Sequence, residues 1–165
     1  RGGGSTGAVG VESGSPGVDL PGVGYQEMLN PERARHTGNT TARNQAEVVK
    51  VTFNPAKVTL ETVLGKLWES HNPTQSDRQG NDVGSNYRSA IYYHDAHQET
   101  AGLAPHATYQ NALDAAGYGG ITTEILPLRH YITADEYHRT YLKNNHDGYC
   151  CLAGTGVNTP APAGK

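Results

Sequence analysis

A polar loop within residues 78–93 carries the densest set of side chains that could do chemistry in this chain. Its hydrogen-bonding side chains are those of Asn81, Asp82, Asn86 and Tyr87. Amides and phenols donate and accept hydrogen bonds, and an ionised carboxylate accepts them, so these groups could bind a polar ligand. Gly80 and Gly84 permit backbone turns that other residues resist. The plain alternative is an ordinary polar connection, but loops of this kind often hold functional residues.

This loop and the strand that follows it resemble a motif of a known enzyme family. The segment Arg78–Tyr93 resembles the RQGNDxGxxYRSAIYY motif of the A-type peptide methionine sulfoxide reductases. Further similar segments, in family order, are Gln45–Pro55, Leu67–Thr74, Ile121–Ile125, Tyr137–Leu142 and Gly148–Cys150. The resemblance covers the chain from Tyr25 to Cys150. It implies an α+β fold, a two-layer sandwich with a central mixed sheet.

The resemblance also implies roles for several polar residues. Glu47 matches the glutamate that protonates the sulfoxide oxygen, Asp82 matches the pocket aspartate, and Tyr87 matches one of two tyrosines that hold this oxygen. The second tyrosine falls at Arg35, and Arg43 lies in the altered stretch before Ala46. Arginine is a charged planar donor, so we expect Arg35 and Arg43 to favour a larger or anionic ligand.

The N-terminal part of the implied site differs from the family pattern. Relatives carry GGGCFWGVE, whose cysteine is the nucleophile, whereas residues 2–10 here read GGGSTGAVG. One alignment places Ser5 at the nucleophile with Thr6 and Gly7 at the aromatic pair, and another places Gly7 at the nucleophile. A serine hydroxyl is neither polarisable nor acidic enough to reduce a sulfoxide, so we expect the usual cycle not to start there.

The only two cysteines, Cys150 and Cys151, are adjacent. Neither their number nor their spacing indicates a zinc site or a disulfide framework. Cys150 matches the first resolving thiol of the family. It could be a relic, a relocated nucleophile that Cys151 resolves, or a thiol with a new role. A disulfide between neighbouring residues closes a small strained ring, which disfavours the second interpretation.

Three functional hypotheses follow from these residues. The first is an enzyme recruited to acid–base chemistry on a small polar molecule with an S=O or C=O group. In it Glu47 is the general acid or base, because a buried glutamate beside an aspartate binds its proton more tightly. The second is a binding module or inactive paralogue. The third is ordinary peptide methionine sulfoxide reduction that uses Cys150 and Cys151. The retained polar residues favour the first hypothesis over the second, because simple binding would not need an acid.

Length and composition predict one compact domain. The chain has 165 residues, a formal net charge of −3, and no apolar run of the roughly 20 residues that span a bilayer. We therefore expect a soluble, cytoplasmic monomer that acts on a small-molecule substrate. We expect no metal, cofactor, nucleic-acid or membrane partner. Within the domain we distinguish a glycine-rich N-terminal segment (residues 1–24), a core (residues 25–152) and a C-terminal tail (residues 153–165).

Periodicity and local signals predict the main elements. Thr59 begins a helix whose apolar face recurs through Trp68, and residues 96–116 form a helix interrupted at Pro105. Strands are predicted at residues 47–53, 88–93 and 121–126. A capping-box pattern at residues 133–136 predicts a helix through Leu142. Trp68 is predicted to lie in the core, and the tail from Thr155 is predicted to wrap the surface or be mobile.

Overall fold

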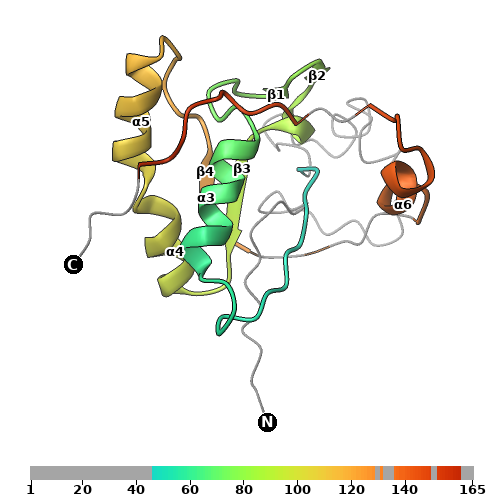
Figure 1. Cartoon of the computed structure of the whole chain (residues 1–165), viewed down its shortest axis with the longest axis horizontal. Helices are drawn as coiled ribbons and strands as arrows, with labels where there is room; N and C mark the ends of the chain where they lie inside the picture. Colours follow the sequence, from blue (N-terminus) through green and yellow to red (C-terminus); the bar gives the residue numbers. More distant parts are fainter. Residues whose placement is uncertain (1–45, 129–130, 132–135, 150–151, 161–165) are drawn as a thin grey trace, which may run out of the picture.

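The computed structural model describes residues 46–128, 131, 136–149 and 152–160. The described part of the chain combines helices with short strands, and the α+β class expected from the sequence is confirmed (Figure 1). The helices are α3 (Leu60–Ser70), α4 (Ala96–Leu103), α5 (His106–Ala115) and α6 (Glu136–Asn144), with a 3-10 turn η1 (Ser85–Tyr87). The strands are β1 (Arg78–Gln79), β2 (Asp82–Val83), β3 (Ala90–Tyr93) and β4 (Glu124–Pro127).

Helix α3 forms where the apolar periodicity predicts it. The Thr59 hydroxyl accepts a hydrogen bond from the backbone N–H of Thr62 at 3.2 Å, which caps the first turn. Leu60, Leu64 and Trp68 recur every four residues and are buried on one face. Trp68 is fully buried, as predicted. This helix therefore supplies one side of the core.

The second predicted helix is divided into two. The Asp95 carboxylate accepts from the backbone N–H of Gln98 at 2.9 Å and caps α4. Pro105 cannot donate a backbone hydrogen bond, and α5 begins at the following residue. The predicted interruption at Pro105 is confirmed. The division lets α5 place Tyr109 and Leu113 in the core beside Trp68.

Strands β3 and β4 pair in parallel, with Ala90 opposite Glu124 and Tyr93 opposite Pro127. Helix α4 covers this pair, where Gly102 lies against the side chains of Ile91 and Ile125. The strands predicted at residues 88–93 and 121–126 are thus present but shorter. The strand predicted at residues 47–53 is not formed in the described structure. A strand needs a continuous ladder, and alternation along the sequence does not provide one.

Residues 152–160, here called the strap, cross α3 and α5 (Figure 1). The Tyr109 hydroxyl lies 3.0 Å from the Trp68 carbonyl, 3.1 Å from the Val157 carbonyl and 3.2 Å from the Thr155 hydroxyl. The Glu69 carboxylate accepts from the hydroxyl and the backbone N–H of Thr159, and these bonds lower the pKa of Glu69. The expected wrapping of the tail is therefore observed as far as residue 160.

Candidate functional site

The polar loop is a short hairpin followed by a turn. Strands β1 and β2 are antiparallel, with Arg78 opposite Val83, and Gly80 adopts a positive φ of 60° at the hairpin turn. Gly84 has a φ of 150°, and a Cβ there would approach the Asn86 side-chain oxygen to 2.6 Å. A larger residue at Gly84 would thus distort the entry to η1, which carries Tyr87.

The hairpin is fixed to the end of α3 by side-chain amides. Gln79 is buried, and its amide accepts from the Asn72 N–H at 3.1 Å and donates to the Asn72 carbonyl at 3.2 Å. The Gln75 side chain accepts from the N–H of Gly80 at 2.8 Å. Such bonds satisfy the backbone groups of the loop and hold it in one conformation. The loop is therefore an ordered platform for Asp82 and Tyr87.

Glu47 joins this platform through its backbone. Its N–H donates to the Asn86 carbonyl at 2.7 Å, which brings Glu47 beside the turn that carries Tyr87. Asp82 and Tyr87 are half-buried, whereas Glu47 is exposed. Glu47 is therefore not the buried glutamate that the acid–base hypothesis assumed. Three of the residues that the sequence analysis assigned to the site nonetheless belong to one region.

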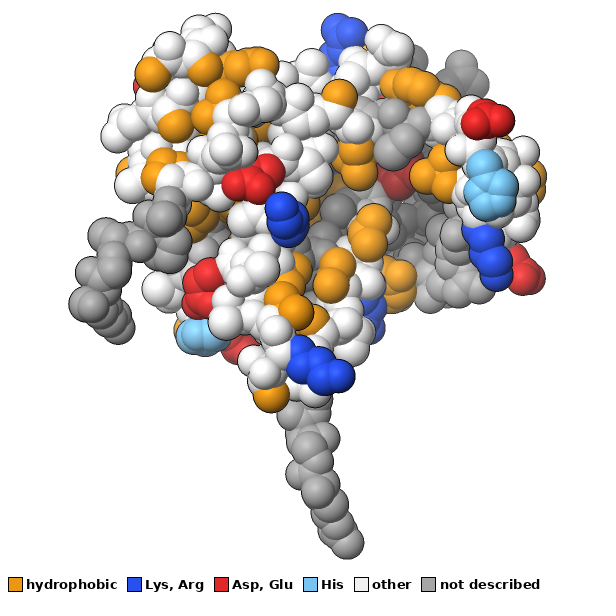
Figure 2. All heavy atoms as spheres, viewed as in Figure 1, with side chains coloured by type: hydrophobic (Ala, Val, Ile, Leu, Met, Phe, Trp, Pro, Cys, Tyr) orange, Lys and Arg blue, Asp and Glu red, His pale blue; other side chains and the backbone are white. Residues whose placement is uncertain are grey.

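The segment that precedes the two cysteines also reaches the loop. The Asn81 N–H donates to the Tyr149 hydroxyl at 3.3 Å, across 68 residues of sequence. Cys150 and Cys151 themselves lie outside the described residues. Val83 and Tyr149 are 70% and 54% exposed, so apolar surface lies beside the polar groups of the loop. Figure 2 shows hydrophobic side chains at the surface across the face drawn there.

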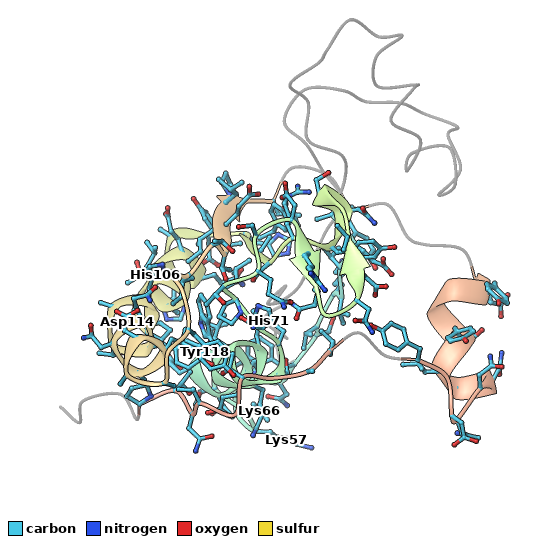
Figure 3. The ribbon with its side chains drawn as sticks, turned by 90° about the horizontal axis from the view of Figure 1, so that it is seen from above. Lys57, Lys66, His71, His106, Asp114 and Tyr118 are labelled. Carbon is cyan, nitrogen blue, oxygen red and sulfur yellow. The ribbon has the colours of Figure 1, made fainter. Side chains whose placement is uncertain are left out.

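His71 links α3 to the strand that follows the loop. Its Nδ1 lies 2.7 Å from the Leu67 carbonyl, which only accepts, so Nδ1 carries the proton. Nε2 then accepts from the Ser89 hydroxyl at 2.6 Å, and the Ser89 oxygen lies 2.7 Å from the Thr123 hydroxyl. Burial lowers the pKa of His71, because a charged imidazolium loses hydration there. Figure 3 shows His71 in the interior, with Lys57 and Lys66 at the edge.

This neutral histidine predicts a loss of stability in mild acid. The lowered folded-state pKa means that the unfolded chain binds the proton first as the pH falls below about 6.5. The contribution of neutral His71 to the free energy of unfolding is thus complete above that pH. It is lost as the pH falls through the folded-state pKa of His71. Urea unfolding at about pH 7.5 and about pH 5 should show a larger decrease for the unmodified protein than for His71→Asn.

The exposed His97 provides the matched control for this measurement. A His97→Asn variant should keep the pH dependence of the unmodified protein. At about pH 7.5, His71→Asn should itself lower the free energy of unfolding by about 1–3 kcal/mol, because the buried Ser89 hydroxyl loses its acceptor. An equal pH dependence in His71→Asn and the unmodified protein would contradict the role of His71.

Sequence reasoning missed Arg88, whose side chain is buried and contacts three elements. It also missed Tyr149 as a contact of the loop. The available signal for Arg88 was a basic residue shortly before the apolar strand residues Ala90 and Ile91, since a buried charge needs a partner. The candidate residues outside the described part of the chain are Ser5, Thr6, Gly7, Arg35 and Arg43. Their roles, and the absence of a family nucleophile from the site, stay predictions.

The described residues contain neither a metal-binding cluster nor a membrane-spanning helix. Within residues 46–128, 131, 136–149 and 152–160, no group of three or more His, Cys, Asp or Glu side chains could hold a metal ion. Among the helices of that same part of the chain, none combines the length and apolar character needed to cross a membrane.

Comparisons with known proteins identify relatives across nearly the whole chain. A family model described as peptide methionine sulfoxide reductase matches residues 6–159. Peptide methionine sulfoxide reductase MsrA 1 of Synechocystis sp. is 48% identical over 145 residues, which cover 88% of this chain and 65% of that protein. The MsrA of Streptomyces griseus is 47% identical over 146 residues, covering 86% of this chain and 66% of that protein. The chain thus spans slightly less than two thirds of the length of these relatives.

Solved structures agree with this assignment. Methionine sulfoxide reductase A of Corynebacterium diphtheriae has a TM-score of 0.67 and 37% identity, covering 96% of this chain and 73% of that chain. Mxr1 of Saccharomyces cerevisiae in its reduced form has a TM-score of 0.64 and 28% identity, covering 94% of this chain and 77% of that chain. The fold, the family model and the sequence relatives converge, and the chain belongs to the peptide methionine sulfoxide reductase family.

Proposed function

We propose that this chain reduces methionine sulfoxide in peptides, with the thiol of Cys150 as the nucleophile. The observation that carries the proposal is the hydrogen bond between the Asn81 N–H and the Tyr149 hydroxyl at 3.3 Å. Asn81 directly precedes Asp82, and Tyr149 directly precedes Cys150. The contact therefore ties the segment that leads into the thiols to the polar loop of the site.

The proposed reaction transfers the sulfoxide oxygen to a cysteine and ends with thiol–disulfide exchange. The Cys150 thiolate attacks the sulfoxide sulfur, the oxygen passes to the cysteine sulfur, and a thioether and a sulfenic acid result. A second thiol then attacks the sulfenic acid, a disulfide forms and water leaves. A dithiol reductant then reduces this disulfide by exchange, which restores the Cys150 thiol and leaves the reductant oxidised as its own disulfide. Because a disulfide between Cys150 and Cys151 closes a strained ring, the reductant supplies the second thiol more readily than Cys151 does.

In this proposal, the described residues supply the polar groups that act on the sulfoxide oxygen. In the proposal, Glu47 donates a proton to the sulfoxide oxygen, and Asp82 and Tyr87 orient that oxygen. Docking of the substrate would cover the exposed Glu47 and remove water from it. The exposed side chain of Val83, which follows Asp82, offers an apolar surface for the methionyl side chain. A polar edge beside an apolar surface matches a sulfoxide flanked by carbon.

This proposal replaces the recruited acid–base chemistry expected from the missing cysteine at residues 5–7. Relatives that are 42–48% identical carry the name peptide methionine sulfoxide reductase. Glu47 is exposed, whereas the acid–base hypothesis started from a buried glutamate. These two observations favour a thiol-dependent reaction over acid–base chemistry alone.

An assay with a methionine sulfoxide peptide tests the proposal. With dithiothreitol in excess, the protein should convert the sulfoxide to the thioether, as followed by mass spectrometry. Prior alkylation of the protein with iodoacetamide should abolish the conversion, because alkylated sulfur is no longer a nucleophile. Alkylation after denaturation and sequencing should locate the label on Cys150 or Cys151. No turnover by the unmodified protein, or turnover that survives complete alkylation, would overturn the proposal.

A further inference from the structure

Arg88 lies at the junction between the functional loop and the strand pair. It follows η1 directly, precedes β3, and is 6% exposed. Its Nη1 donates to the Ser85 carbonyl at 2.5 Å, its Nη2 to the Tyr92 hydroxyl at 3.1 Å, and its Nε to the Glu124 carboxylate at 3.1 Å. One guanidinium group therefore connects the 3-10 turn, β3 and β4.

The pair with Glu124 keeps this charge inside the protein. The side chain of Arg88 is 4% exposed and that of Glu124 is 21% exposed. A buried guanidinium without a carboxylate partner would be strongly destabilising, so the pair must stay together when the protein is folded. The Glu124 N–H donates to the Ser89 carbonyl at 3.0 Å, beside the ion pair. That backbone bond fixes the register of β4 that places the Glu124 carboxylate beside Arg88.

The turn that Arg88 holds is the one that assembles the site. Within it, the Tyr87 N–H donates to the Gly84 carbonyl at 2.9 Å, and the Asn86 carbonyl accepts from Glu47 at 2.7 Å. A displacement of η1 would move Tyr87 and Glu47 relative to Asp82. We propose that Arg88, held by Glu124, is a positioning residue for sulfoxide reduction that sets the placement of Glu47 and Tyr87. The inference rests on the proposed function and adds a residue to it.

The geometry requires arginine at this position. Its planar fork presents several N–H donors in fixed directions, whereas lysine carries a single ammonium group at the end of a flexible chain. Lysine at position 88 could keep the charge and one partner, but it could not hold the Ser85 carbonyl, the Tyr92 hydroxyl and Glu124 in the same arrangement. An Arg88→Lys variant thus keeps the positive charge but loses the arrangement of the three hydrogen bonds.

Two measurements on Arg88→Lys and Glu124→Gln test the inference. Hydrogen exchange should become about tenfold faster or more at the amides of Glu47 and Tyr87, because the turn opens more readily. In Arg88→Lys, which keeps a charge beside Glu124, exchange at the Tyr109 amide in α5 should increase less than at Glu47 and Tyr87, which shows that the effect is concentrated at the turn. In the peptide assay, kcat should fall roughly tenfold to a hundredfold with KM little changed, since misplacement affects chemistry more than binding.

Lys66→Met provides the matched control. Lys66 is 82% exposed and lies 3.7 Å from Glu69 on α3, so the variant breaks an ion pair outside the loop. It should leave both measurements unchanged. Unchanged exchange at Glu47 and Tyr87 in Arg88→Lys and in Glu124→Gln would overturn the inference. If the unmodified protein shows no turnover, the proposed function fails, and the exchange data still decide whether Arg88 holds the turn. Faster local exchange with an unaltered kcat would show a structural role only and would also overturn it.

Discussion

A Cys150→Ser, Cys151→Ser double variant is expected to lose all dithiothreitol-dependent reduction of methionine sulfoxide peptides. These residues are the only cysteines of the chain, so no other thiol can attack the sulfoxide sulfur. A hydroxyl in their place is only negligibly ionised near neutral pH, and its oxygen does not accept oxygen from the substrate as sulfur does. The measurement is thioether formation per mole of protein, with fold retention checked by circular dichroism.

Single variants then separate the two thiols. If Cys150 attacks and the external dithiol resolves, Cys150→Ser should be inactive, whereas Cys151→Ser should retain most of the activity. The control is Ala153→Ser, which adds a hydroxyl to the exposed part of the same segment and keeps both thiols. Its activity should match that of the unmodified protein. Full activity in the double variant would disprove the thiol mechanism for this chain.

A Glu47→Gln variant is expected to lower kcat by roughly a hundredfold or more while KM changes little. Glutamine keeps the size of the side chain and can donate a hydrogen bond, but it cannot release a proton to the sulfoxide oxygen. The backbone bond from Glu47 to the Asn86 carbonyl does not involve the side chain, so the loop should stay in place. Steady-state kinetics with saturating dithiothreitol measure both parameters.

Asp114→Asn makes the same carboxylate-to-amide change on α5, outside the site (Figure 3). It should leave kcat and KM unchanged. A Glu47→Gln variant with a kcat within about twofold of the unmodified protein would show that the proton comes from another group. Loss of binding with an intact kcat would instead assign Glu47 to substrate recognition alone.

The helices of this protein were predictable because their signals are local. Thr59 lies at the first turn that it caps, and Pro105 prevents helix continuation through its own ring. The strand predicted at residues 47–53 was wrong because alternation does not identify a pairing partner. The strands near residues 90 and 124 were found, but their parallel register depends on contacts between distant segments.

The candidate site shows the same difference between local sequence signals and contacts between distant segments. Asp82 and Tyr87 are close in sequence and could be recognised together from one motif. Their approach to Glu47 and Tyr149 depends on backbone and side-chain bonds across 39 and 68 residues, which no local pattern specifies. Arg88 was missed because its significance depends on Glu124, 36 residues away. Residue types therefore identified the members of the site, and tertiary bonds determined their exposure and arrangement.

The strap can pack against α3 and α5 only late in the synthesis of this chain. Tyr109 and Glu69 each have hydrogen-bond partners in residues 155–159, so these contacts on α3 and α5 are missing while those residues are still in the ribosome. Both cysteines are synthesised before these last contacts can form. A nascent chain halted after residue 151 would thus carry its thiols on a domain whose α3 and α5 still lack their hydrogen bonds to the strap.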